Sequence, residues 1–154
     1  MEEKSMYVMI DNFDSFVYNL KAYFQELGRE ILVRRCDEIT LEELEELNPE
    51  GIILSPGPKR PWDAKLCVDT VKRFQGRIPV LGVCLGHQAI GEAFGARLEN
   101  LKEVYHGVQT PVSILRQDVL FEGLGKEIPV GRYHSWVVSR EDFPDCLEIT
   151  AESR

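Results

Sequence analysis

Residues 78–94, IPVLGVCLGHQAIGEAF, decide the fold of this 154-residue chain. A short apolar run leads into two glycines that flank a cysteine, and small and apolar residues follow at helical spacing. Such a pattern is typical of a buried strand that passes through a sharp turn into a helix. It predicts a strand over 78–83 and a helix over 86–94, with Cys84 presented at the junction.

The same alternation of strand and helix extends toward the N-terminus. Apolar runs predict strands, and the amphipathic segments between them predict helices. We expect strands over 6–11, 30–35 and 51–54, and helices over 15–27, 41–47 and 64–74. Strands that alternate with helices at this pace indicate a three-layer α/β fold, with a mostly parallel sheet and helices on both faces.

Capping residues support these helix boundaries. Asp14 or Ser15 is placed to cap the first helix, and Gly28 lies where a glycine that ends a helix belongs. Thr40 and Glu43 match a capping box at the start of the second helix.

The pattern changes after Gly95. Residues 108–115, 128–139 and 147–153 alternate between apolar and polar side chains, are rich in β-branched residues and have no helices between them. They predict the strands of a small, antiparallel extension. Because no repeat or linker divides the sequence, we expect residues 1–154 to form a single domain.

Composition excludes several classes of function. The formal net charge of −8 argues against binding nucleic acid, because no basic stripe is present to neutralise phosphates. No apolar run approaches the length that spans a membrane, and the polar, acidic start is unlike a signal peptide. The four cysteines form no CxxC pair, so the sequence predicts no metal site. Scattered single cysteines suit a reducing cytoplasm.

Cys84 has the surroundings of a nucleophile on a tight turn. Gly82 and Gly86 relieve crowding two residues before and two residues after it. The following helix points its N-terminus at the sulfur, which favours the thiolate, and the amide of Leu85 faces the place where an oxyanion would form. The alternative is a small buried cysteine in a glycine-rich turn.

A thiolate nucleophile requires a base, and the chain holds three histidines. His87 follows Cys84 on the same helix and is placed to pack or to orient the turn. His106 lies in a loop-like segment. His134, near a strand, is the one serious internal candidate, although for each of the three a structural hydrogen bond is favoured over a catalytic role.

Four blocks, in order, make the chain similar to the class I (triad-type) glutamine amidotransferases. The resemblance is greatest to the glutaminase subunits of anthranilate synthase and aminodeoxychorismate synthase, and it covers essentially the whole chain. The blocks are residues 11–20 (DNFDSFVYNL), 54–58 (LSPGP), 82–88 (GVCLGHQ) and 131–136 (GRYHSW). They resemble the family's opening block, oxyanion loop, nucleophile motif and glutamine-contacting segment, and they imply the flavodoxin-like fold of that family.

The resemblance implies hydrolysis of glutamine to glutamate and ammonia. Cys84 would form a thioester with the side-chain acyl group, and the backbone amides of Gly57 and Leu85 would hold the oxyanion. The backbone of Ser135 and Trp136 would bind the α-amino and carboxylate ends of glutamine, and His134 is not the base in this family. The substrate site so implied comprises Gly57, Pro58, Lys59, Gln88, Ser135 and Trp136.

The resemblance also implies a partner. The ammonia would pass to a chorismate-binding synthase subunit (component I) in a hetero-oligomer. Anthranilate synthase is favoured, and aminodeoxychorismate synthase is the alternative. This half of the reaction needs no cofactor, whereas the partner normally requires magnesium.

Three departures from the family bear on function. The His-Pro-Glu segment that supplies the family's base and orienting acid is absent, as are the last strand and helix, so the chain is either a fragment or truncated. We therefore expect residues 1–154 alone to be nearly inactive. Lys59 replaces a small residue after Pro-Gly-Pro and is favoured to point to solvent. The alternative is that it crowds the glutamine pocket or interacts with the substrate carboxylate. Residues 105–110 replace a basic segment, which leaves the partner open.

Two other functions stay open. A truncated, non-catalytic module could still dock on the synthase subunit. A different cysteine hydrolase on a similar fold could use His134 as its base.

Overall fold

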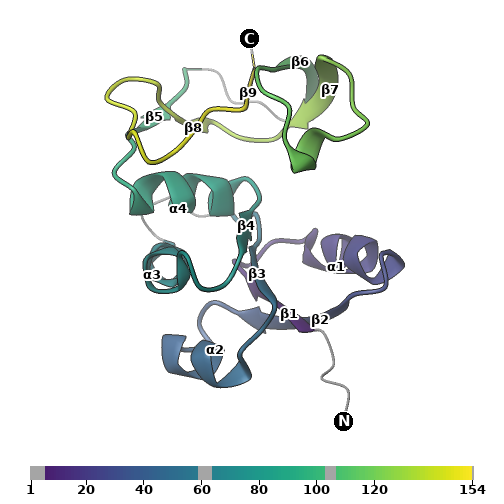
Figure 1. Cartoon of the computed structure of the whole chain (residues 1–154), viewed down its shortest axis with the longest axis vertical. Coiled ribbons are helices and arrows are strands. Elements are labelled where there is room, and N and C mark those ends of the chain that lie inside the picture. The colour runs from purple at the N-terminus through teal and green to yellow at the C-terminus, as the bar shows by residue number, and fades with distance from the viewer. Residues whose placement is uncertain (1–5, 59–63, 103–106, 154) are drawn as a thin grey trace.

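A four-stranded parallel sheet forms the centre of the lower part of the molecule (Figure 1). The computed structural model describes residues 6–58, 64–102 and 107–153. The sheet has the order β2-β1-β3-β4, which is the order of the first four strands of a flavodoxin-like sheet. Its strands are β1 (Met6–Asp11), β2 (Glu30–Arg35), β3 (Gly51–Leu54) and β4 (Val80–Gly82).

Helices cover both faces of this sheet (Figure 1). Helix α1 (Val17–Glu26) packs on one face, where Met9 and Val17 belong to one apolar cluster. The opposite face carries α2 (Leu41–Leu47), α3 (Lys65–Phe74) and α4 (Leu85–Ala93). Val8 and Ile10 belong to the cluster on that second face, so alternate residues of β1 serve the two sides. The predicted three-layer fold is confirmed.

The start of α1 differs from the sequence prediction. The N-cap is Phe16, and no side chain caps it. Asp14 accepts the amide N–H of Phe16 at 3.0 Å instead, so it orders the turn before the helix. The end of the helix agrees with the prediction. Gly28 has a φ of 77° and donates to Gln25 O, which is half of a Schellman motif.

Helix α2 begins at the predicted cap, with one change in the bonding. The Thr40 hydroxyl oxygen accepts the amide N–H of Glu43 at 3.2 Å, as predicted. The carboxylate of Glu43 accepts a hydrogen bond from that hydroxyl, and not from the backbone N–H that closes a full capping box.

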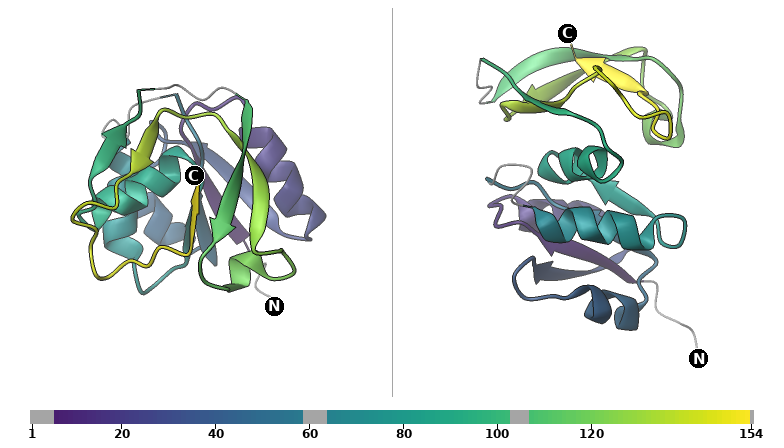
Figure 2. Two further views of the ribbon diagram at one scale, coloured as in Figure 1. Left: turned by 90° about the horizontal axis from the view of Figure 1, so that it is seen from above. Right: turned by 90° about the vertical axis from the view of Figure 1, so that its left-hand side faces the viewer.

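An antiparallel layer lies above α4 (Figure 2). One pair joins β5 (Leu98–Asn100) to β8 (Trp136–Val138), and both strands contact α4. Strands β7 (Glu127–Arg132), β6 (Val108–Ile114) and β9 (Ala151–Ser153) form a second sheet, and a short 3-10 helix, η2 (Val119–Phe121), precedes β7. The predicted extension is confirmed.

Two details of that layer were not predicted. Strand β5 carries no strong signal in the sequence. Residues 128–139 were predicted as one strand but contribute to two sheets, because the chain leaves the ladder after Arg132 and re-enters at Trp136. At this break the carbonyl oxygen of Ser135 accepts the amide N–H of Leu101 at 2.6 Å, which ties the segment to the end of β5.

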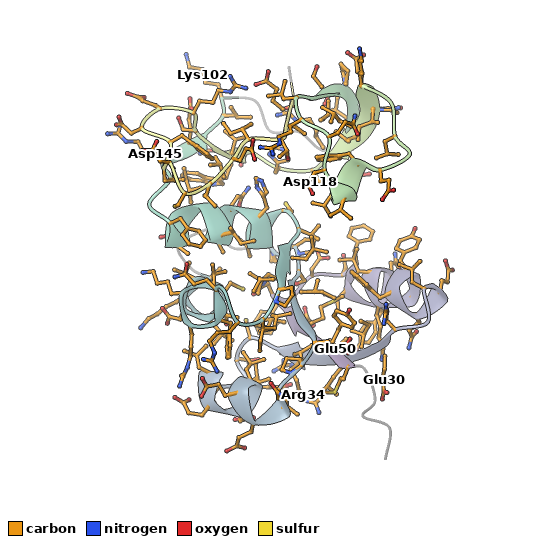
Figure 3. The ribbon with its side chains drawn as sticks, in the orientation of Figure 1. Glu30, Arg34, Glu50, Lys102, Asp118 and Asp145 are labelled. Carbon is orange, nitrogen blue, oxygen red and sulfur yellow. The ribbon has the colours of Figure 1, made fainter. Side chains whose placement is uncertain are left out.

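Burial differs sharply between the two layers. Among the described residues, every fully buried apolar side chain lies between Val8 and Ala96. Charged side chains such as Glu30, Lys102 and Asp145 lie at the periphery of the molecule (Figure 3). No helix in the described ranges is long and apolar enough to cross a membrane.

Candidate active site

Three loops meet at the carboxyl end of the parallel sheet. They follow β1, β3 and β4, and because these strands are parallel neighbours in the sheet, the loops lie side by side. A cleft of about 1490 Å³ opens between them and the antiparallel layer. Residues that line it include Asp14, Gly57, Cys84, Gln88, His134 and Trp136.

Cys84 lies at the N-cap of α4 in a strained backbone conformation. Its φ is 54° and its ψ is −105°, a region that residues with a side chain rarely adopt. The flanking glycines make this turn possible. A Cβ on Gly82 would lie 2.5 Å from the carbonyl carbon of Gly86, and a Cβ on Gly86 would lie 2.3 Å from the carbonyl oxygen of Leu54. The predicted tight turn at Cys84 is therefore present.

The electrostatics of Cys84 differ from the sequence expectation. Burial raises the pKa of the thiol, and the carboxylate of Asp14 raises it further. The amide N–H of Leu85 acts in the opposite direction, as expected of a helix N-terminus, but its effect is smaller than that of burial. At neutral pH the group rests as a thiol, so its attack on a substrate requires a proton acceptor.

The two described histidines both line the cleft, and they differ in their surroundings. His134 places Nδ1 3.0 Å from the carbonyl oxygen of Trp136, which fixes the ring against β8. Its pKa is lowered by burial and by the charge of Arg132. His87 opens into the cleft with an exposed side chain, and partial desolvation lowers its pKa. His106 lies outside the described residues.

The two expected oxyanion donors lie on adjacent segments. A Cβ on Gly57 would lie 2.6 Å from the carbonyl oxygen of Asn12 and 2.9 Å from Cδ2 of Leu85. The loop after β3 therefore packs against both the loop after β1 and the first residue of α4. Only a glycine fits at this position without displacing backbone.

The expected substrate residues are partly brought together. Gln88 is buried and donates from Nε2 to the carbonyl oxygen of Trp136 at 2.7 Å, so its side chain links α4 to β8. Pro58 lines the cleft near Gly57. Ser135 precedes Trp136 at the break between β7 and β8, and Lys59 lies outside the described residues.

Sequence reasoning missed two polar residues of this site. Asn12 is buried beneath the loop that carries Gly57, and it forms two hydrogen bonds to Ser55. One signal was available: each of the two is a polar residue placed directly after a buried strand. The sequence offers no sign that they bind one another, because they are 43 positions apart.

Comparisons with known proteins agree with this arrangement. The model of the family "Glutamine amidotransferase class-I" matches residues 8–154. Anthranilate synthase component 2 of Pseudomonas putida is 50% identical over 94% of this chain and 72% of its own length. Aminodeoxychorismate synthase component 2 of Serratia marcescens is 47% identical over 96% of this chain and 77% of its own.

A solved structure supports the fold alone. A glutamine amidotransferase from Thermotoga maritima superimposes with a TM-score of 0.72 at 16% identity, covering 90% of this chain and 64% of that one. The matched family, the close relatives and the cysteine elbow at the end of a parallel sheet point in one direction: the chain belongs to the class I glutamine amidotransferase family.

Proposed function

We propose that the chain is the glutaminase subunit of a chorismate-using synthase, and that it supplies the partner subunit with ammonia from glutamine. The observation that carries this proposal is the strained Cys84 elbow, which lines a cleft together with Gly57. Family membership supports the same chemistry, since a thiol at such a turn is the nucleophile expected for acyl transfer.

In the proposed reaction, the sulfur of Cys84 attacks the side-chain amide carbon of glutamine. The carbonyl electrons move to oxygen, and the backbone amides of Gly57 and Leu85 hold that oxyanion. Collapse of the intermediate expels ammonia, which takes up the thiol proton through a base, and leaves a thioester. Water then hydrolyses the thioester to glutamate and restores the thiol. We assign the base to neither His87 nor His134.

We place glutamine between the loop after β3 and the start of β8. Pro58 ends the oxyanion loop and Lys59 follows it in the sequence, and the backbone of Ser135 and Trp136 offers groups for the α-amino and α-carboxylate ends. Gln88 supports this wall, because its bond to the carbonyl oxygen of Trp136 fixes β8 over α4. The cleft is formed by both layers, which supports our proposal that residues 1–154 act as one domain.

The proposed partner is the chorismate-binding component I. We favour anthranilate synthase over aminodeoxychorismate synthase, although relatives named for the two are 50% and 47% identical to the chain, a difference too small to separate them. Four free cysteines support a reducing cytoplasm as the place of action.

The test measures glutamate released from glutamine by the chain expressed with a chorismate-using synthase subunit. We expect release that Cys84→Ser abolishes, while added ammonium sustains the partner in both cases. The aminated product, anthranilate or aminodeoxychorismate, identifies the synthase. Binding of the partner without any release of glutamate, and without acylation of Cys84, would contradict the glutaminase and leave a docking module.

A further inference from the structure

The oxyanion loop is held by a side chain where the parallel ladder stops. The β1–β3 pairing ends at Ile10 and Leu54, and the amide N–H of Ser55 still donates to the carbonyl oxygen of Ile10 at 3.1 Å. Beyond that point Asn12 continues the pairing. Its amide N–H donates to Oγ of Ser55 and its Nδ2 donates to the carbonyl oxygen of Ser55, both at 2.9 Å.

The hydrogen bonds of Asn12 are fixed from the other side as well. Its Oδ1 accepts a hydrogen bond from the thiol of Cys67 on α3 at 3.4 Å. This bond determines which way the side-chain amide is oriented. Asn12 is 1% exposed, and Ser55 and Cys67 are fully buried. Ser55 in turn donates to the carbonyl oxygen of Pro56, the residue before Gly57, at 2.8 Å. A buried amide with this many partners is rigid.

Gly57 rests directly on this group. A Cβ at Gly57 would lie 2.6 Å from the carbonyl oxygen and 2.8 Å from Cβ of Asn12. The backbone of Gly57 therefore packs closely on Asn12, and a shift of Asn12 toward the loop would press on it. An oxyanion donor is effective only within a few tenths of an ångström of its proper place, because hydrogen-bond strength falls steeply with distance and angle.

We propose that Asn12 is a positioning residue, whose bonds to Ser55 hold the amide N–H of Gly57 on the acyl oxygen of the substrate. The inference rests on the proposed glutaminase function and adds the group that sets the geometry of its oxyanion site. Asn12 is buried and is not among the described residues that line the cleft, so it acts through Ser55 and Gly57.

The experiment compares two electrophiles that alkylate Cys84. One is the glutamine-shaped chloroketone 2-amino-4-oxo-5-chloropentanoate, whose ketone oxygen occupies the oxyanion position. The other is iodoacetamide, which needs no oxyanion donor. In each case a C–S bond forms, a halide ion leaves and the thiol proton passes to solvent. Mass spectrometry of the peptide that contains Cys84 gives each rate separately from the other cysteines.

Asn12→Asp removes the Nδ2 donor at nearly unchanged volume, and Ser55→Ala removes the hydroxyl that accepts the amide N–H of Asn12. We expect each variant to slow the chloroketone by about 10- to 100-fold, part of the effect of deleting an oxyanion donor. The iodoacetamide rate should stay within about twofold. Thr70→Val is the matched control, because Thr70 is fully buried on α3 and bonds only to Leu66 in its own helix.

Two outcomes would overturn the inference. In the first, the chloroketone rate is unchanged in both variants. In the second, each variant slows both reagents equally, and by no more than Thr70→Val slows them. Thermal melting shows whether each variant folds. If one does not, the alkylation rates of the other variant test the inference. Failure of the proposed function is recognised separately, because the unmodified chain would then react no faster with the glutamine-shaped chloroketone than with chloroacetone.

Discussion

Cys84 combines a backbone with a positive φ and a thiol whose pKa is raised. The strain at φ 54° is maintained by the packing of the two flanking glycines, and it aims the sulfur at the cleft. Burial keeps the proton on the sulfur by raising the pKa. The group is thus placed for attack but is not activated until a base or a bound substrate changes its surroundings.

The pH dependence of alkylation tests this description. Only the thiolate reacts, so the iodoacetamide rate at Cys84 should rise with pH and keep rising beyond the ordinary range of a thiol, since burial raises the pKa. Asp14→Asn removes one negative charge that opposes ionisation. We expect it to lower the pKa and to speed alkylation at pH 8 by about twofold to threefold.

Asp14→Asn keeps the acceptor for the amide N–H of Phe16, so the turn before α1 should survive the substitution. Circular dichroism checks this. A slower reaction at pH 8 in a folded variant would show that Asp14 does not act on Cys84 through its charge.

The sequence predicts single residues well where spacing encodes geometry. Two glycines around Cys84 can be read directly, because a tight turn excludes side chains at those offsets. The direction in which the thiol pKa is shifted could not be predicted, since it depends on how deeply the cleft walls bury the turn. The role of Asn12 could not be predicted either, because hydrogen bonds to a distant residue leave no local pattern.

At the scale of elements, the two glycines at the junction of β4 and α4 have closer neighbours than any described glycine of the antiparallel layer. Gly82→Ala would drive a methyl group into the backbone of Gly86, 2.5 Å away. We expect a loss of about 1–3 kcal/mol or more in the free energy of unfolding, measured by urea denaturation. Gly125→Ala is the control, because its nearest contact is an ordinary 3.8 Å.

Gly125→Ala should change the free energy of unfolding by no more than about 0.5 kcal/mol. Equal effects of the two substitutions would mean that the elbow can relax, and that its close packing does not hold the strained turn.

Helix α2 gives a second test at this scale. Thr40→Ala removes the one side-chain cap at its start, and we expect a loss of about 1 kcal/mol in the free energy of unfolding. Thr40→Ser should retain most of that stability, since it keeps the hydroxyl that accepts the amide N–H of Glu43. If the serine variant loses as much as the alanine variant, the methyl group rather than the cap stabilises the helix.

The sequence indicates which elements exist more reliably than where they end. The strands over 6–11, 30–35 and 51–54 have the predicted bounds, because each contains a run of consecutive apolar residues with clear breaks on either side. The strand over 78–83 is shorter than predicted, Val80–Gly82. The break in residues 128–139 was missed, because Tyr133 and Trp136 suit a strand locally while tertiary contacts pull the chain into another sheet.

For the whole molecule, the two layers differ in how they are stabilised. Fully buried apolar side chains lie in the α/β layer, while the described part of the chain from Arg97 onward has only Arg132 in the buried class. Opening of the antiparallel layer thus exposes little apolar surface and costs little free energy. Cys84 and one wall of the cleft therefore belong to parts of different local stability.

Native-state hydrogen exchange tests that difference. We expect the amides of β1 and β3 to be protected close to the global free energy of unfolding, and those of β6, β7 and β9 to exchange faster by at least about tenfold. Mass spectrometry on peptides from each strand measures it. Equal protection throughout would show that the two layers unfold as one unit.

The loops that carry Cys84 and Gly57 come from residues 11–88, and the opposite wall of the cleft comes from β7 and β8. The chain crosses between these parts once, at the open, left-handed Gly95. The protein is thus suited to fragment complementation. Two pieces divided near that glycine should each lack selectivity for glutamine-shaped reagents and regain it on mixing, which would make reassembly of the cleft a signal for association of any two proteins fused to them.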